Sequence, residues 1–196
     1  RKKARNSNWP VVPMLAREIR KKLAKAKVRP DALLEGLEVS DADSSVSDTN
    51  ARPEKLKVFF DADVLISGAA PRSRQSAPFI LLQLSELTLI EGVSSPYVVE
   101  QAERNIQAKL PNALEDFIHL REAAVSLAPD PTIEELERFQ GLAHPEDLPV
   151  LASAVLSGCR YLVTRNLQHY PKVVGTLRVV DPGQLVRKIR RHLAKL

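Results

Sequence analysis

The sequence has very little cysteine and no long apolar run, and these two absences exclude several classes of protein. Only Cys159 is a cysteine among 196 residues, which excludes an internal disulfide or a cysteine-built zinc site and suits a reducing compartment. No apolar stretch approaches the roughly 18–20 residues of a membrane span, and no signal peptide is recognisable. We therefore predict a cytoplasmic protein without a membrane segment. Because the first residue is Arg1 rather than Met, we expect the natural chain to begin upstream.

Positive charge is concentrated at the start of the chain. The formal net charge is +5 and the pI about 9.4, which mildly favours a polyanionic partner such as nucleic acid. Leu15, Ile19 and Leu23 recur at helical spacing among Lys and Arg and predict a basic amphipathic helix over 14–27. Such a helix suits RNA, an anionic lipid surface or a partner's groove, and a solvated, partly helical tail is the alternative.

An acidic, Ser-rich stretch separates this helix from the rest of the chain. Residues 38–54 have no periodicity, which predicts a disordered linker. We therefore divide the chain into a basic helical segment with its linker, 1–54, and a folded domain, 55–196.

Within the domain, strand and helix patterns alternate. Strands are predicted from Val58 to the acids Asp61 and Asp63 and over 88–93, 125–128, 161–164 and 177–180, with helices over 76–87, 96–106, 111–121, 132–139, 147–158 and 181–193. This alternation predicts an α/β fold with a parallel sheet flanked by helices.

The chemistry is expected where the first apolar run is interrupted by acids. Val58, Phe59 and Phe60 are followed at once by Asp61 and Asp63, and apolar residues then resume. The run is typical of a strand buried on both faces. Ligands of open α/β sheets bind in the crevice beyond the strand ends, which is where these two acids would lie.

Other polar residues are predicted to reach the same edge of the sheet. Glu100 and Asp147 lie in the first turns of predicted helices, and Asn166 follows a predicted strand. Together with Asp61 and Asp63 they form an oxygen-rich set of the kind that Mg²⁺ or Mn²⁺ prefers. Such an ion holds a phosphodiester and activates water. The histidines are scattered and indicate no zinc site (His119, His144, His169, His192).

These stretches resemble, in order, the motifs of the PIN domain family. The run Val-Phe-Phe-Asp61-Ala-Asp63-Val-Leu-Ile-Ser-Gly resembles the opening motif, Glu100 in Pro-Tyr-Val-Val-Glu the second acid, and Asp147 in Glu-Asp-Leu-Pro-Val-Leu-Ala-Ser-Ala the third. The stretch from Tyr161 to Pro171 resembles the closing motif. The similarity runs from about Lys57 to Leu185, and the branch it most resembles is the VapC-like toxins of bacterial type II toxin–antitoxin pairs.

The resemblance implies a three-layer α/β/α fold and a Mg²⁺- or Mn²⁺-dependent endoribonuclease held inactive by an antitoxin protein. RNA would be the substrate, and a homodimer is expected because PIN relatives are often dimers. The implied catalytic residues are Asp61, Glu100, Asp147 and Asn166, the metal ligands Asp61, Asp63, Glu100 and Asp147, and the substrate-binding residues Thr164 and Arg165.

The chain departs from the family pattern at three positions. Asp63 stands where most members have Asn, Asn166 where Asp is frequent, and His169 where some relatives supply an Asp. A PIN domain that binds RNA or protein without cutting is therefore an alternative. A second alternative is a haloacid-dehalogenase-like phosphatase with a nucleophilic Asp61. That family needs a second acidic pair after a late strand, which 164–166 do not supply.

Each candidate residue also has a purely structural interpretation. Asp147 can act as a helix N-cap, worth ~1 kcal/mol, and Glu100 can interact with a helix dipole. Asp63 can hydrogen-bond its own loop. Arg165 can be a solvated surface residue, and His169 a packed surface histidine.

Overall fold

The computed structural model describes Lys25, residues 55–70 and residues 76–194. Lys25 is helical, but the rest of the helix predicted over 14–27 and the linker predicted over 38–54 lie outside the described residues. The boundary between 54 and 55 therefore stays a prediction.

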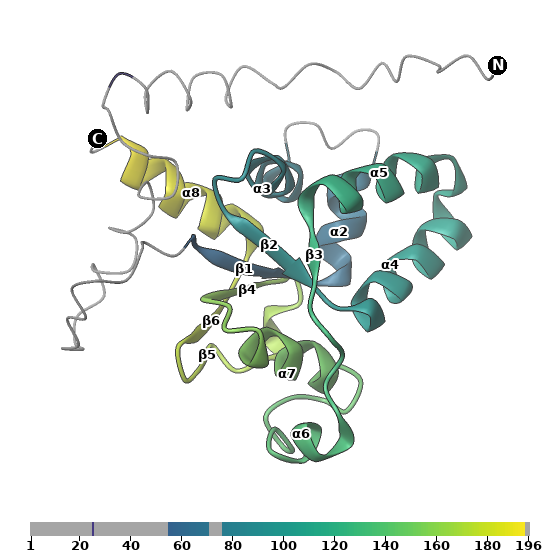
Figure 1. Ribbon diagram of the computed structural model, residues 1–196, viewed down its shortest axis with the longest axis vertical. Helices are drawn as coiled ribbons and strands as arrows, with labels where there is room; N and C mark the ends of the chain where they lie inside the picture. The colour runs from purple at the N-terminus through teal and green to yellow at the C-terminus, as the bar shows by residue number, and fades with distance from the viewer. Residues whose placement is uncertain (1–24, 26–54, 71–75, 195–196) are drawn as a thin grey trace.

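The described chain alternates between strands and helices, as predicted (Figure 1). The strands are β1 (Lys57–Phe60), β2 (Glu91–Ser94), β3 (Ser126–Leu127), β4 (Tyr161–Val163), β5 (Val173–Val174) and β6 (Leu177–Val180). The helices are α2 (Ala62–Ala69), α3 (Ala77–Glu86), α4 (Pro96–Lys109), α5 (Leu114–Ala124), α6 (Ile133–Glu137), α7 (Leu148–Leu156) and α8 (Pro182–Leu193), with 3-10 turns η2 (Pro111–Ala113) and η3 (Leu167–His169). None of these helices is both long and apolar enough to cross a bilayer.

The strands form one sheet in the order β3-β2-β1-β4-β6-β5. Every pair is parallel except β5 with β6, so the predicted parallel sheet is confirmed apart from one edge. Phe59 in β1 pairs with Val93 on one side and Leu162 on the other. The sequence analysis missed β5, a two-residue strand joined to β6 by a tight turn that places Gly175 at φ +56°.

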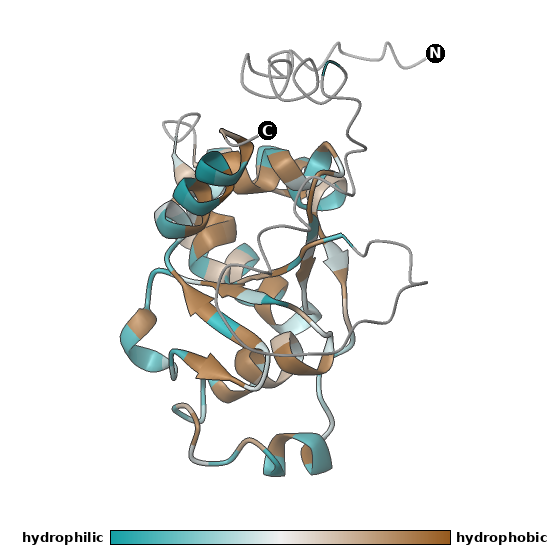
Figure 2. Ribbon diagram, turned by 90° about the vertical axis from the view of Figure 1, so that its left-hand side faces the viewer, coloured by the Kyte–Doolittle hydropathy of each residue, from teal (hydrophilic) through white to brown (hydrophobic). Residues whose placement is uncertain are grey.

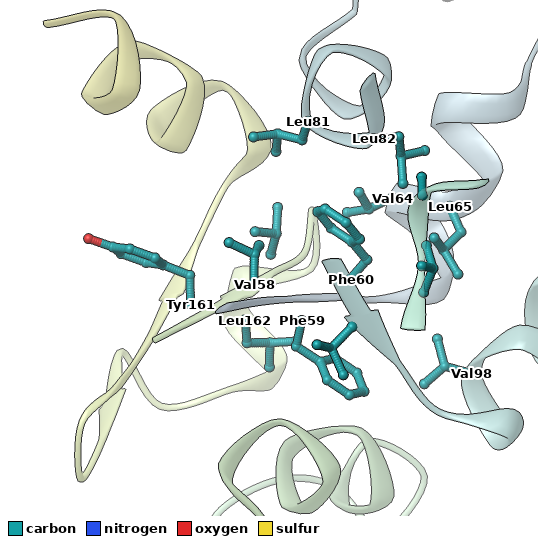
Figure 3. Close-up of a cluster of buried hydrophobic side chains, with 14 of the residues drawn as sticks. Val58, Phe59, Phe60, Val64, Leu65, Leu81, Leu82, Val98, Tyr161 and Leu162 are labelled. Carbon is teal, nitrogen blue, oxygen red and sulfur yellow. The ribbon is translucent and has the colours of Figure 1, made fainter. Parts of the chain in front are cut away.

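Helices cover both faces of the sheet (Figure 1). The helices α2, α3, α5 and α8 pack together on one face, and α7 packs on β2 and β4 from the other. Figure 3 shows how β1 serves both layers, with Val58 and Phe60 directed toward Leu81 and Phe59 toward the opposite side. This arrangement is the expected three-layer α/β/α fold, with a strand buried on both faces at its centre.

Hydropathy follows the same layers. Figure 2 shows apolar strands inside and a more hydrophilic outer face on α8. On α8, Leu185 and Ile189 are buried whereas Arg187, Arg190 and Arg191 are exposed. The outer face of the last helix is therefore basic.

The first strand ends at its acids, as predicted, but the sequence analysis missed the helix that follows it at once. The strand ends at Phe60, and α2 starts at Ala62 with Asp61 as its N-cap. Asp61 Oδ1 accepts a hydrogen bond of 2.7 Å from the Ala62 N–H, and its carbonyl accepts one of 3.1 Å from Leu65 N–H. An N-capping aspartate thus converts the apolar run from strand to helix.

The strand predicted over 88–93 begins later, at Glu91. Thr88 has a φ of +59°, and the N–H of Leu89 turns back to the Leu84 carbonyl at 2.9 Å. The first half of this apolar stretch therefore closes α3 and does not extend β2.

Candidate active site

The carboxyl ends of β1 and β4 bring the predicted site residues to one edge of the sheet. Asp61 follows β1 directly, and its N–H donates to the Val163 carbonyl of β4 at 3.1 Å. Thr164 and Arg165 follow β4, so strand pairing places them beside the two aspartates of the opening motif. This is the edge at which ligands of parallel sheets bind.

Asp61 is the most enclosed acid of the site, with 6% of its surface exposed. Its carboxylate accepts hydrogen bonds from the Ala62 N–H at 2.7 Å, from Tyr170 Oη at 3.3 Å and from the Thr164 hydroxyl. Burial raises the pKa of Asp61, these three donors lower it, and the charge of Asp147 raises it again. The net direction is upward, so burial outweighs the three donors and disfavours the ionised carboxylate.

Asp63 lies in the first turn of α2, and only one of its two carboxylate oxygens is hydrogen-bonded among the described residues. Its Oδ2 accepts a hydrogen bond of 2.8 Å from the Arg165 N–H, whereas its Oδ1 is buried and has no hydrogen-bond partner among the described residues. Burial and then the charge of Asp61 raise the pKa of Asp63 to about 6. Asp63 therefore bonds the turn after β4, and its other carboxylate oxygen has no hydrogen-bond partner among the described residues.

Asp147 occupies the N-cap position of α7, but its side chain makes no capping hydrogen bond within the described part of the chain. Its backbone is helical (φ −95°, ψ −14°), whereas Asp61 caps α2 from an extended conformation. The Asp147 Oδ2 instead lies 3.2 Å from Nδ1 of His169. The interpretation of Asp147 as a side-chain cap is therefore wrong. Its charge acts on Asp61 and Tyr170, which places it at the same edge.

Tyr170 is a site residue that the sequence analysis missed. It is 7% exposed and follows η3, and its hydroxyl donates to Asp61. Burial is the largest cause that raises the pKa of Tyr170. The charges of Asp61 and Asp147 and the hydrogen bond to Asp61 raise it further. A tyrosine in the closing motif was the only available indication, because the contact joins residues 109 positions apart.

Glu100 and Asn166 are less closely connected to the cluster. Glu100 is exposed on α4 and is not among the charges that dominate the pKa values of Asp61 or Asp63. Asn166 is exposed, and its backbone N–H donates to Thr164 Oγ1 at 3.0 Å. Among the described residues, no three Asp, Glu, His or Cys side chains stand together as a metal-binding group. The metal-ligand role of Glu100 and the catalytic role of Asn166 stay predictions.

Arg165 presents a cation at the rim of this edge. Its guanidinium Nη1 donates to Ser67 Oγ at 3.0 Å, and the residue is exposed. Thr164, in contrast, is fully buried and holds Asp61. Of the two residues predicted to bind substrate, only Arg165 is exposed enough to contact it. Thr164 is buried and hydrogen-bonds Asp61.

The chemical type of the donors, though not their spacing among the described residues, suits a hard divalent cation. Asp61, Asp63 and Asp147 offer carboxylate oxygens, which are the ligands that Mg²⁺ and Mn²⁺ prefer. The buried Oδ1 of Asp63 lacks a donor among the described residues, and a cation would satisfy it.

Comparison with known proteins identifies the family of this chain. The family model described as PIN domain matches residues 57–168, which are more than half of the chain, so the protein belongs to the PIN domain family. The family is generally one of nucleases, and its members typically use divalent metal ions. The family membership decides against the dehalogenase-like phosphatase.

Among solved structures, the chain is similar to VapBC2 from Rickettsia felis bound to a DNA fragment from their promoter. The TM-score is 0.47 at 12% sequence identity, over 64% of this chain and 98% of that one. No curated protein matches the chain.

Proposed function

We propose that this PIN domain is a metal-dependent endoribonuclease that hydrolyses phosphodiester bonds in single-stranded or looped RNA. The observation that carries the proposal is the group of acids at the carboxyl edge of the sheet. Asp61 and Asp63 come from the β1–α2 junction and Asp147 from the start of α7, and one oxygen of Asp63 is buried without a donor among the described residues.

In this proposal Asp61, Asp63 and Asp147 would hold Mg²⁺ or Mn²⁺, with Glu100 as a further ligand from the motif. A bound ion supplies a Lewis acid for the phosphate and lowers the pKa of water. Arg165 would bind a phosphate of the RNA through its exposed guanidinium.

The other polar residues of the closing motif have supporting roles. Thr164 holds Asp61 through its hydroxyl, and its Oγ1 accepts from the Asn166 N–H, which shapes the turn after β4. The exposed amide side chain of Asn166 would orient water or RNA at the rim of the site.

The biological setting is also part of the proposal and is supported by the resemblance of the motifs to the VapC-like branch. We place the protein in the cytoplasm, as a homodimeric toxin neutralised by a cognate antitoxin. Induced expression in a bacterial host tests the toxin assignment. Growth arrest by the wild type and normal growth with Asp61→Asn would support it, and normal growth with both proteins would contradict it.

The enzymatic assignment is tested by incubating a labelled RNA pool with Mg²⁺ or Mn²⁺. We compare the wild type with Asp61→Asn and Asp147→Asn, and with Asp116→Asn as the control, because Asp116 is exposed on α5. Metal-dependent cleavage that is lost in the first two variants and retained in the control is expected. Cleavage that persists without metal, or in Asp61→Asn, would contradict the proposal.

The second candidate is a PIN domain that binds RNA or protein without cutting. It is favoured by the engagement of Asp147 with His169 and by Asn166 at a position where Asp is frequent. A wild type that retards RNA in a gel but never cuts it, with either metal, would establish this candidate.

A further inference from the structure

The turn after β4 brings two consecutive side chains to two different carboxylates of the site. His169 Nδ1 lies 3.2 Å from Asp147 Oδ2, and Tyr170 Oη lies 3.3 Å from Asp61 Oδ2. Tyr170 is 7% exposed, so its hydroxyl is held at the inner end of the turn while His169 stays at the surface. None of the roles assigned above uses this phenol.

We propose that Tyr170 is a positioning residue for Asp61, and that its hydroxyl fixes the carboxylate in the orientation that binds the divalent cation. The inference rests on the metal site of the proposed function. It concerns the binding of the ion and does not depend on which nucleic acid is cut.

The hydrogen bonds of Asp61 give the physical reason. The Ala62 N–H occupies Oδ1, and the phenol of Tyr170 occupies Oδ2, so each oxygen has a donor that limits rotation of the carboxylate. A carboxylate oxygen has two lone pairs, which leaves Oδ2 able to accept from Tyr170 and to bind a cation at the same time. Hydrogen-bonded partners of this kind orient metal ligands, and their loss typically weakens metal affinity about 10–100-fold.

Thr164 cannot replace the phenol. Its hydroxyl has one donor hydrogen, which already serves Asp61, while its oxygen accepts the Asn166 N–H at 3.0 Å. Without the Tyr170 hydroxyl, Asp61 would keep its burial and lose one of three donors. Its carboxylate would then be free to turn or to take up a proton in place of a cation.

The substitution Tyr170→Phe isolates the hydroxyl, because it retains the buried ring. The direct measurement is Mn²⁺ affinity in the absence of RNA, from the electron paramagnetic resonance signal of the free ion. We expect the affinity of Tyr170→Phe to fall about tenfold or more. Tyr161→Phe is the matched control, because Tyr161 is also buried but lies at the other end of β4.

Three results would overturn the inference. They are an affinity of Tyr170→Phe within twofold of the wild type, an equal loss in Tyr161→Phe, and a wild type that binds no Mn²⁺. A purely structural role would lower the melting temperature of the metal-free protein and leave Mn²⁺ affinity unchanged. If the wild type binds Mn²⁺, Tyr170→Phe binds it tenfold more weakly and neither cuts RNA, the inference stands and the nuclease proposal fails.

Discussion

The carboxylate of Asp63 accepts a hydrogen bond of 2.8 Å from the backbone N–H of Arg165, which lies 102 residues further along the chain. This contact joins the first turn of α2 to the turn after β4. It satisfies only one oxygen, because Oδ1 of Asp63 is buried with no donor among the described residues. The site therefore contains an acid whose ionisation is disfavoured by burial and by the charge of Asp61.

Asp63→Asn is expected to stabilise the metal-free protein at neutral pH. The pKa of Asp63 is raised from 3.8 to about 6, so the folded state binds this proton more tightly than the unfolded state does. The contribution of Asp63 to stability is thus present below about pH 4 and is lost as the pH rises through about 6. We expect Asp63→Asn to increase the free energy of unfolding by about 1–3 kcal/mol at pH 7.5.

Urea denaturation at pH 4 and pH 7.5, without divalent ions, measures this effect. The difference between wild type and Asp63→Asn should be large at pH 7.5 and small at pH 4, and Asp116→Asn should show no such pattern. A difference independent of pH would contradict the raised pKa of Asp63.

Arg165→Ala is expected to lower the affinity for RNA. It is also expected to make that affinity less dependent on salt concentration. Each phosphate contact contributes about 0.7 to the slope of log affinity against log salt concentration for a single strand. Arg160→Ala is the control, because Arg160 directly precedes β4 and Arg165 lies beyond its other end. Fluorescence anisotropy with a labelled oligonucleotide over a salt series gives both slopes. An unchanged slope in Arg165→Ala would remove this residue from the RNA contact.

Ser85→Ala is expected to destabilise the fold by about 2–4 kcal/mol, because two buried backbone groups would lose their partner. The Ser85 hydroxyl donates to the Ala124 carbonyl at 2.6 Å and accepts from the Gly92 N–H at 2.7 Å. Ser157→Ala, which removes the hydrogen bond from the C-cap of α7 to the Ser153 carbonyl, should cost less than about 1 kcal/mol. Chemical denaturation compares the two, and equal losses would contradict a bridging role for Ser85.

Cys159 is expected to be unreactive in the folded protein. It is 1% exposed, and burial raises the pKa of its thiol to about 12. Since the thiolate is the reactive form, a disulfide reagent at pH 8 should react about a thousandfold more slowly with the native than with the denatured protein. The chain has no second cysteine, so the absorbance of the released thiol reports on Cys159 alone. Rapid reaction of the native protein would show that the end of α7 opens.

Local patterns were sufficient to predict most elements of the domain. The N-caps at Ser76 and Asp181 and the capping box of Thr132 with Glu135 form as their residue types predict. These caps join side chains and backbone groups only a few residues apart, so the local sequence contains all the information they need.

Apolar composition alone did not distinguish strand from helix. The run from Val58 to Ile66 is almost continuously apolar, and periodicity does not separate a buried strand from a short buried helix. The hydrogen bond from the Ala62 N–H to Asp61 and the pairing of β1 with β2 and β4 decided where the strand ends.

By itself, the sequence determined the alternating α/β order, the PIN motifs and the placement of Asp61 and Asp63 after the first strand, because neighbouring residues encode these features. Only the tertiary structure decided which side chains meet there. The pairing of Asp147 with His169, the bond of Asp63 to Arg165 and the contact of Tyr170 with Asp61 each depend on the parallel pairing of β1 with β4 and on the path of the following turn. Such contacts join residues far apart in the chain, and no local pattern specifies them.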